Sequence, residues 1–262
     1  MRLSISNIGW SSDYDEEMYV RLQNMNYQGL EIAPTRIFPD APYSRLKEAS
    51  AFSKDLQTKY ALVIPSIQSI WYGHTERIWG EKTEREFLLD YTRQAIDFAV
   101  ALGSNNLVFG CPKNRNMPDN ADMDVAFEFF YQLGEYAHGK GTCIGFEANP
   151  PVYNTNFINT TKDAIEFIRK VGSEGLKLNL DVGTMICNDE GLDVLDHNEN
   201  LINHVHISEP GLSVIVKRDM HRSLKDLLDD IRYSGFVSIE MGSKASVDEI
   251  TEAMAYVESI FR

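Results

Sequence analysis

Short apolar runs alternate along the whole chain with segments in which apolar residues recur at helical spacing. The runs predict β-strands and the spaced segments predict α-helices, an alternation typical of a parallel α/β fold. The predicted strands cover residues 3–8, 29–34, 61–68, 106–112, 143–147, 176–181, 202–207 and 236–240. Eight such units, of roughly 33 residues each, favour a closed (β/α)8 barrel (TIM barrel) over an open doubly wound sheet.

The expected helices carry recognisable ends. Five apolar residues at helical spacing precede Gly103, a frequent type of helix terminator: Leu88, Tyr91, Ala95, Phe98 and Leu102. Ser246 and Glu249 form a capping-box pattern at the start of the last helix. The chain has 262 residues, and one barrel usually needs about 250, so we expect a single domain over residues 1–262.

Each of the last four predicted strands ends near a potential metal ligand: Glu147, Asp181, His206 and Glu240. Side chains of a strand alternate between its two faces, so Asn179, His204 and Ser238 share the face of the ligand on their own strand. The apolar residues between them then pack against the helices. Because the carboxyl ends of barrel strands form the active-site face, we expect the four ligands to converge there. The alternative is a set of hydrogen-bonded polar residues inside the barrel.

Three carboxylates and one imidazole form an oxygen-rich ligand set that suits one Mn²⁺ or Mg²⁺ ion, with Zn²⁺ or Co²⁺ as alternatives. A divalent cation polarises a ketose carbonyl and stabilises the ene-diolate formed when the neighbouring C–H proton is removed. Glu147 and Glu240 are then the candidate catalytic acid and base. Return of the proton to the opposite face gives epimerisation, and return to the adjacent carbon gives isomerisation.

Five further residues are candidates for substrate binding: Glu31, Gln68, Trp71, His204 and His221. Glu31 and Gln68 lie on the second and third predicted strands. Each is either a functional group of the site or a buried polar residue that anchors the fold. Trp71 is a candidate wall for a sugar face. His204 either orients a ligand or is a packed core histidine, and His221 either reaches the site from a loop or lies in the first turn of a helix. The long loops after the third, fourth and fifth strands are the expected pocket walls.

Charge and composition narrow the class of ligand. The formal net charge of −14 and the sequence pI near 4.8 oppose binding to nucleic acids and anionic membranes. No apolar run approaches the roughly 20 residues that span a bilayer, and the N-terminus lacks a long apolar signal core. We therefore expect a cytoplasmic protein that binds a small molecule, and the resemblance described next implies a sugar or sugar derivative. A homo-oligomer is compatible with the sequence.

Four segments resemble the metal-ligand blocks of the xylose isomerase-like superfamily, which includes ketose 3-epimerases, hydroxypyruvate isomerases and inosose dehydratases. They are GFEANP at Glu147, LNLDVGTM at Asp181, HVHISE at His206 and GFVSIEM at Glu240. The resemblance covers nearly the whole chain. It implies a TIM barrel, one divalent ion held by these four residues, and an isomerase or epimerase acting on a sugar or sugar phosphate.

The chain departs from the ketose 3-epimerase pattern at three substrate-contact positions. Thr184 replaces a histidine, Leu212 an arginine and Tyr153 an acidic residue, so the resemblance implies no particular sugar. A metal-dependent dehydratase or lyase acting on a related polyol or keto-sugar, and a sugar-binding barrel without catalysis, are the alternatives. Endonuclease IV-type DNA repair enzymes share the barrel, but they need a basic face, which a net charge of −14 opposes.

Overall fold

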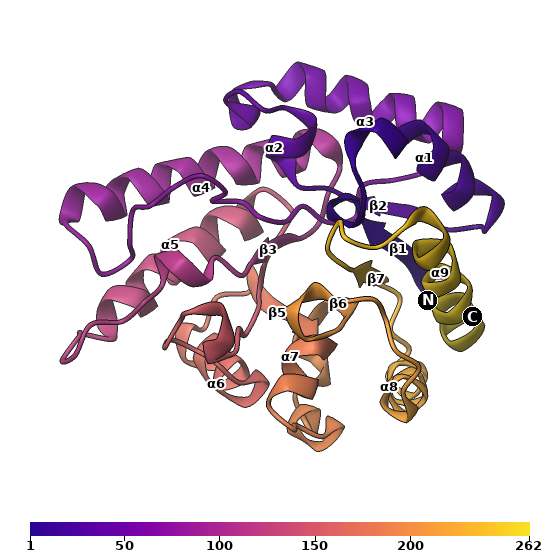
Figure 1. The fold of residues 1–262 in the computed structure, drawn as a ribbon. Helices are drawn as coiled ribbons and strands as arrows, with labels where there is room; N and C mark the ends of the chain where they lie inside the picture. The colour runs from indigo at the N-terminus through magenta and orange to yellow at the C-terminus, as the bar shows by residue number, and fades with distance from the viewer.

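The computed structural model describes residues 1–262, in which helices surround a barrel of parallel strands, with the two chain ends close together (Figure 1). The strand order is β2-β1-β7-β6-β5-β4-β3. The strands are β1 (Arg2–Ser6), β2 (Gly29–Glu31), β3 (Leu107–Phe109), β4 (Ile144–Phe146), β5 (Leu176–Asp181), β6 (Ile202–Ser208) and β7 (Phe236–Glu240). The helices are α1 (Asp15–Asn24), α2 (Pro34–Ile37), α3 (Leu46–Tyr60), α4 (Lys82–Leu102), α5 (Asp124–Gly139), α6 (Thr161–Val171), α7 (Val182–Cys187), α8 (Asp219–Asp230) and α9 (Val247–Phe261).

An extended segment, rather than a regular strand, closes the barrel between β2 and β3. Residues 61–68 are predicted as the third strand, but they form only isolated bridges. Val63 faces Gly29 of β2, and Ile67 bridges Ile32, just after β2, and Leu107 of β3. Pro65 lacks an N–H and cannot donate to a ladder. The Ile67 carbonyl still accepts a hydrogen bond from the Val108 N–H at 2.8 Å. The expected barrel is thus confirmed, with seven regular strands and one irregular segment.

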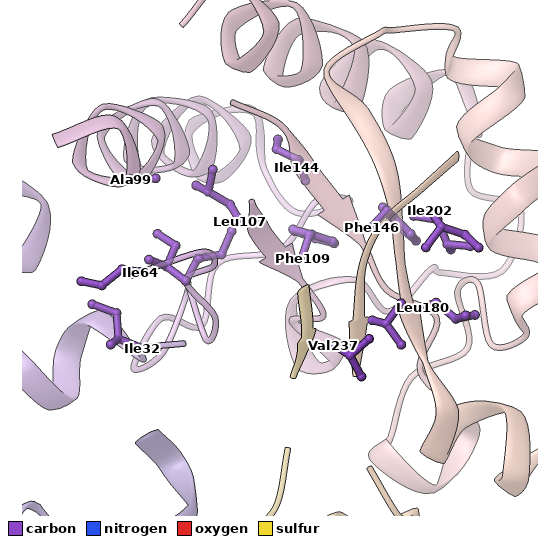
Figure 2. Close-up of a cluster of buried hydrophobic side chains, with 14 of the residues drawn as sticks. Ile32, Ile64, Ala99, Leu107, Phe109, Ile144, Phe146, Leu180, Ile202 and Val237 are labelled. Carbon is purple, nitrogen blue, oxygen red and sulfur yellow. The ribbon is translucent and has the colours of Figure 1, made fainter. Parts of the chain in front are cut away.

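A continuous apolar layer lies between the strands and the helices. Leu107 and Phe109 of β3, and Ile144 and Phe146 of β4, belong to this layer (Figure 2). The Phe146 ring centroid lies 5.5 Å from that of Phe109 and 5.0 Å from that of Phe167 on α6. Such aromatic contacts add to the stabilisation from burial. The layer fixes the rotation of each strand, and thereby the direction of the alternate side chains that point inward.

The barrel interior holds polar side chains, as the period-two pattern predicts. Asn179, His204 and Ser238 are all buried, while the intervening apolar residues of the same strands belong to the apolar layer. Gly145 is required beside Asn106, because a Cβ atom there would lie 2.5 Å from the Asn106 Oδ1 atom. The missing side chain at Gly145 therefore leaves room for the amide of Asn106, which precedes β3.

The helix ends follow the sequence signals. Helix α4 ends at Gly103, which adopts the left-handed conformation with φ of 76°. Helix α9 begins with the expected capping box, in which Ser246 and Glu249 each accept a hydrogen bond from the backbone of the other. None of the helices combines the length and the apolar character that crossing a membrane requires.

Candidate metal centre and active site

Four side chains from neighbouring strands meet at the carboxyl end of the barrel: Glu147, Asp181, His206 and Glu240. Glu147 directly follows β4, Asp181 and Glu240 are the last residues of β5 and β7, and His206 lies on β6. Their potential ligand atoms all lie within 4.8 Å of one another. Asp181 also pairs with His206 in the register of β5 and β6, next to a register shift at residues 178–179. Such irregularities often redirect side chains beside active sites.

The imidazole of His206 is held between carboxylates on both sides. Its Nδ1 atom lies 3.2 Å from Glu147 Oε2, 3.4 Å from Glu240 Oε2 and 3.9 Å from Asp181 Oδ2. Its Nε2 atom lies 3.1 Å from the Glu31 carboxylate on β2. Metal-binding histidines commonly use one ring nitrogen for the metal and the other for such a carboxylate, which fixes the tautomer and the ring orientation.

The pKa shifts in this cluster show a buried excess of negative charge. Burial, together with the charges of Glu147 and Glu240, raises the pKa of Asp181 to about 7. Burial likewise raises the pKa of Glu240. Burial opposes a charged His206, but the carboxylates around it hold its pKa well above the ordinary value. A divalent cation would offset this repulsion, so the donor set and its charge both fit a metal ion.

Glu31 lies behind the metal-ligand candidates and does not line the cavity. Its carboxylate is fully buried, and burial alone would raise its pKa, but His206 and His204 hold that pKa well below the ordinary value. His204 Nε2 lies 3.1 Å from Glu31 Oε2, at an angle outside hydrogen-bond geometry. Gln68 donates to Glu31 Oε1 at 3.1 Å and to Ser6 Oγ at 2.6 Å. Among these residues only Gln68 lines the cavity.

Neighbouring amide and hydroxyl groups orient the carboxylates. Asn179 Nδ2 donates to Glu147 Oε2 at 2.7 Å, and Asn149 Nδ2 donates to Glu147 Oε1 at 3.0 Å. Ser208 Oγ donates to Asp181 Oδ2 at 2.5 Å. The sequence interpretation missed Ser208 because it ended the strand at residue 207. Continuing the period of two beyond His206 would have found it. The same step beyond Glu147 reaches Asn149, although both of these residues lie past the end of β4.

Arg115, in the loop after β3, supports Glu147 from below. Its guanidinium is fully buried, and Nη1 donates to the Glu147 carbonyl oxygen at 2.8 Å. The guanidinium carbon lies 5.3 Å from the Phe146 ring centroid, and no carboxylate forms an ion pair with it. Burial lowers the pKa of Arg115 to about 10. The side chain thus places an unpaired positive charge close to the acidic cluster.

A cavity of about 200 Å³ opens beside the four ligand candidates and is lined by Glu147, Asp181 and Glu240. This volume is below the roughly 300–1,000 Å³ of sites for drug-sized ligands, which favours a small ligand. Tyr153, Thr184 and Leu212 also line it. All three positions at which the sequence departs from ketose 3-epimerases therefore face this cavity.

Trp71 and His221, both candidates for substrate binding, do not line this cavity, although Trp71 lines a hollow that adjoins it. Trp71 is 2% exposed, and its Nε1 atom donates to Thr92 Oγ1 on α4 at 2.8 Å. Most of its large ring packs against the apolar layer. His221 lies in the first turn of α8, where it shares the buried face with Leu224 and Leu228. Its Nδ1 atom lies 2.9 Å from the Tyr256 hydroxyl, and burial lowers its pKa to about 4.

The family model for the xylose isomerase-like TIM barrel matches residues 20–260. The chain belongs to this family. The match covers most of the barrel, in agreement with the parallel strand arrangement of the structure.

Solved structures of other members of the fold are similar over the full chain. D-psicose 3-epimerase from Clostridium cellulolyticum H10, determined with D-tagatose, has a TM-score of 0.82 at 14% identity and covers 100% of both chains. The Escherichia coli 3-keto-D-glucoside 4-epimerase has a TM-score of 0.78 at 18% identity and covers 99% of both chains. D-allulose 3-epimerase from a Methylomonas species has a TM-score of 0.73 at 21% identity, covering 100% of this chain and 93% of its own. A search of curated protein sequences finds no match. At these identities the similarity establishes a shared fold.

Proposed function

We propose that the protein is a divalent-metal-dependent sugar isomerase or epimerase that transfers a proton at a carbon next to a carbonyl. The observation that carries this proposal is the convergence of Glu147, Asp181, His206 and Glu240 beside a small cavity. The structural neighbours support the reaction class, because they include epimerases of D-psicose and of a 3-keto-D-glucoside.

Glu147, Asp181, His206 and Glu240 would hold one metal ion, with His206 contributing Nδ1. Their oxygen-rich set suits Mn²⁺ or Mg²⁺, with Zn²⁺ and Co²⁺ as alternatives. When bound, the ion supplies polarisation of the substrate carbonyl and stabilisation of the negative charge on the ene-diolate oxygens. The fixed carboxylate and imidazole positions then orient the carbonyl and the adjacent hydroxyl of the sugar.

Glu147 and Glu240 would act as the acid/base pair. Glu147 follows β4 and Glu240 ends β7, two strands that β5 and β6 separate in the sheet, and both residues line the cavity. One carboxylate removes the proton from the carbon beside the carbonyl, and the other returns a proton to the opposite face or to the adjacent carbon. Burial raises the pKa of Glu240, a direction that favours proton uptake by this carboxylate.

Exchange of the substrate's carbon-bound proton with solvent deuterium tests this function. Manganese-loaded protein is incubated in D₂O with a panel of ketoses, and deuterium incorporation is followed by NMR. We expect incorporation by the wild type and a loss of about 10²–10⁴-fold in Glu147→Gln and Glu240→Gln, the contribution of a general base. Glu86→Gln, on the exposed face of α4, is the matched control and should retain the wild-type rate.

The outcomes of this experiment separate the candidate functions. Full exchange in Glu240→Gln would remove that residue from the mechanism. Loss of water from a substrate would identify a dehydratase, and binding of a ketose without any exchange would identify a sugar-binding barrel.

A further inference from the structure

Leu212 holds a bulky apolar side chain at a backbone position that leucine rarely adopts. Its φ is 54° and that of the preceding Gly211 is 71°, so both residues are left-handed. Glycine or asparagine adopts this conformation with less steric cost. The Leu212 N–H donates to the Glu209 carbonyl at 2.9 Å, and its carbonyl accepts from the Gly242 N–H at 2.8 Å. The loop is thereby fixed beside the end of β7, with Leu212 lining the cavity.

Ile8 provides a second apolar side chain on the other side of Glu240. It follows β1 directly, and it lines the same cavity as Leu212. Strands β1 and β6 are the two neighbours of β7 in the sheet, so the residues that follow them flank the carboxyl end of β7. Next to Glu240, the cavity therefore offers apolar contacts from Ile8 and Leu212.

The cavity also lacks a positive side chain to receive an anionic substituent. The charged residues that line it are all acidic: Glu147, Asp181, Glu209 and Glu240. Arg218 is close in space to this set, but its Nε and Nη2 atoms both donate to Glu209. A phosphate or carboxylate on the substrate would face these carboxylates without the arginine or lysine partner that such groups require.

On the basis of the proposed function, we infer that the substrate is an uncharged deoxyketose whose methyl terminus lies between Ile8 and Leu212. The polar part of the sugar faces Glu147 and Asp181. A hydroxyl at the terminus would lose its hydrogen bonds to water against the two apolar side chains, whereas a methyl group would gain contacts there. Leu212 is then a specificity-determining residue. This role would offset the steric cost of a leucine in the left-handed backbone conformation.

Equilibrium binding of matched sugars tests this inference without requiring turnover. Isothermal titration of manganese-loaded protein compares fructose, psicose and tagatose, in both enantiomeric series, with their 6-deoxy counterparts. We expect the deoxy form of the preferred pair to bind at least about 10-fold tighter, within the roughly 100-fold limit by which an apolar pocket rejects an added hydroxyl. Leu212→Ser should abolish the preference, and Leu212→Met, which keeps an apolar side chain, should retain it. Thermal melts establish that both variants are folded.

Three results would overturn the inference: equal or tighter binding of the hydroxylated sugar, an unchanged preference in Leu212→Ser, or no binding by any sugar of the panel. Lys113 lines an adjoining hollow, so ketose 6-phosphates are included as the competing ligand class. Tighter binding of a phosphorylated ketose, lost in Lys113→Ala, would also overturn it. A deoxy preference without deuterium exchange would refute the proposed function alone, and exchange without a preference would refute this inference alone.

Discussion

Replacing Glu31 by glutamine removes a buried charge behind His206 while keeping the shape of the side chain. The Glu31 carboxylate is fully buried and lies 3.1 Å from His206 Nε2, on the side of the ring opposite the other carboxylates. A glutamine amide can no longer provide a charged acceptor that fixes the tautomer and makes Nδ1 a stronger ligand. Loss of such a partner typically costs 10–100-fold in metal affinity. We therefore expect Glu31→Gln to weaken Mn²⁺ binding by about 1.4 to about 2.8 kcal/mol.

The assay is titration of metal-free protein with Mn²⁺, followed by electron paramagnetic resonance of the free ion, with thermal melts to verify folding. His204→Gln is the matched control, because His204 also lies beside the Glu31 carboxylate but forms no ion pair with the carboxylates that line the cavity. It should have a much smaller effect. An unchanged affinity in folded Glu31→Gln would show that packing alone holds His206. An equal loss in His204→Gln would show that any disturbance of this buried layer weakens the site.

Two further expectations concern pH. Asp181 has a pKa of about 7 in the metal-free fold, so metal binding must displace its proton. The affinity for Mn²⁺ should therefore rise as pH increases towards about 7, more steeply in the wild type than in Asp181→Asn. Calorimetry in buffers of different ionisation enthalpy should detect the released proton. His221 has its pKa lowered from 6.5 to about 4, so the folded state binds fewer protons than the unfolded state between these values. The free energy of unfolding should therefore fall by on the order of 3 kcal/mol as pH decreases through this window. The same loss in acid melts of His221→Phe would contradict the assignment of this effect to His221.

Much of the site follows from the alternation of side chains along strands. Asp181 and His206 could be placed at one end of the barrel, with Asn179 and His204 below them, because parallel strands align their carboxyl ends and a period of two fixes the inward face. The contact between His206 and Glu31 could not be predicted. These residues are 175 positions apart, and no local pattern specifies which inward-facing groups meet across a barrel.

The wrong or incomplete predictions have local physical reasons. Pro65 interrupts the third strand by removing a backbone donor, although the apolar run around it resembles a regular strand. Trp71 is buried because its ring packs into the apolar layer, which residue type alone does not reveal. His221 did carry a usable signal, since its helical spacing to Leu224 and Leu228 places it on the buried face of α8.

The most direct test of the metal centre is an anomalous difference map at the manganese absorption edge, from crystals grown with Mn²⁺. We expect one strong peak bonded to the carboxylates of Glu147, Asp181 and Glu240 and to Nδ1 of His206, and no peak at that position in Asp181→Asn crystals. A wild-type map without density among these four side chains, at a manganese concentration that saturates binding in solution, would contradict the proposed metal site.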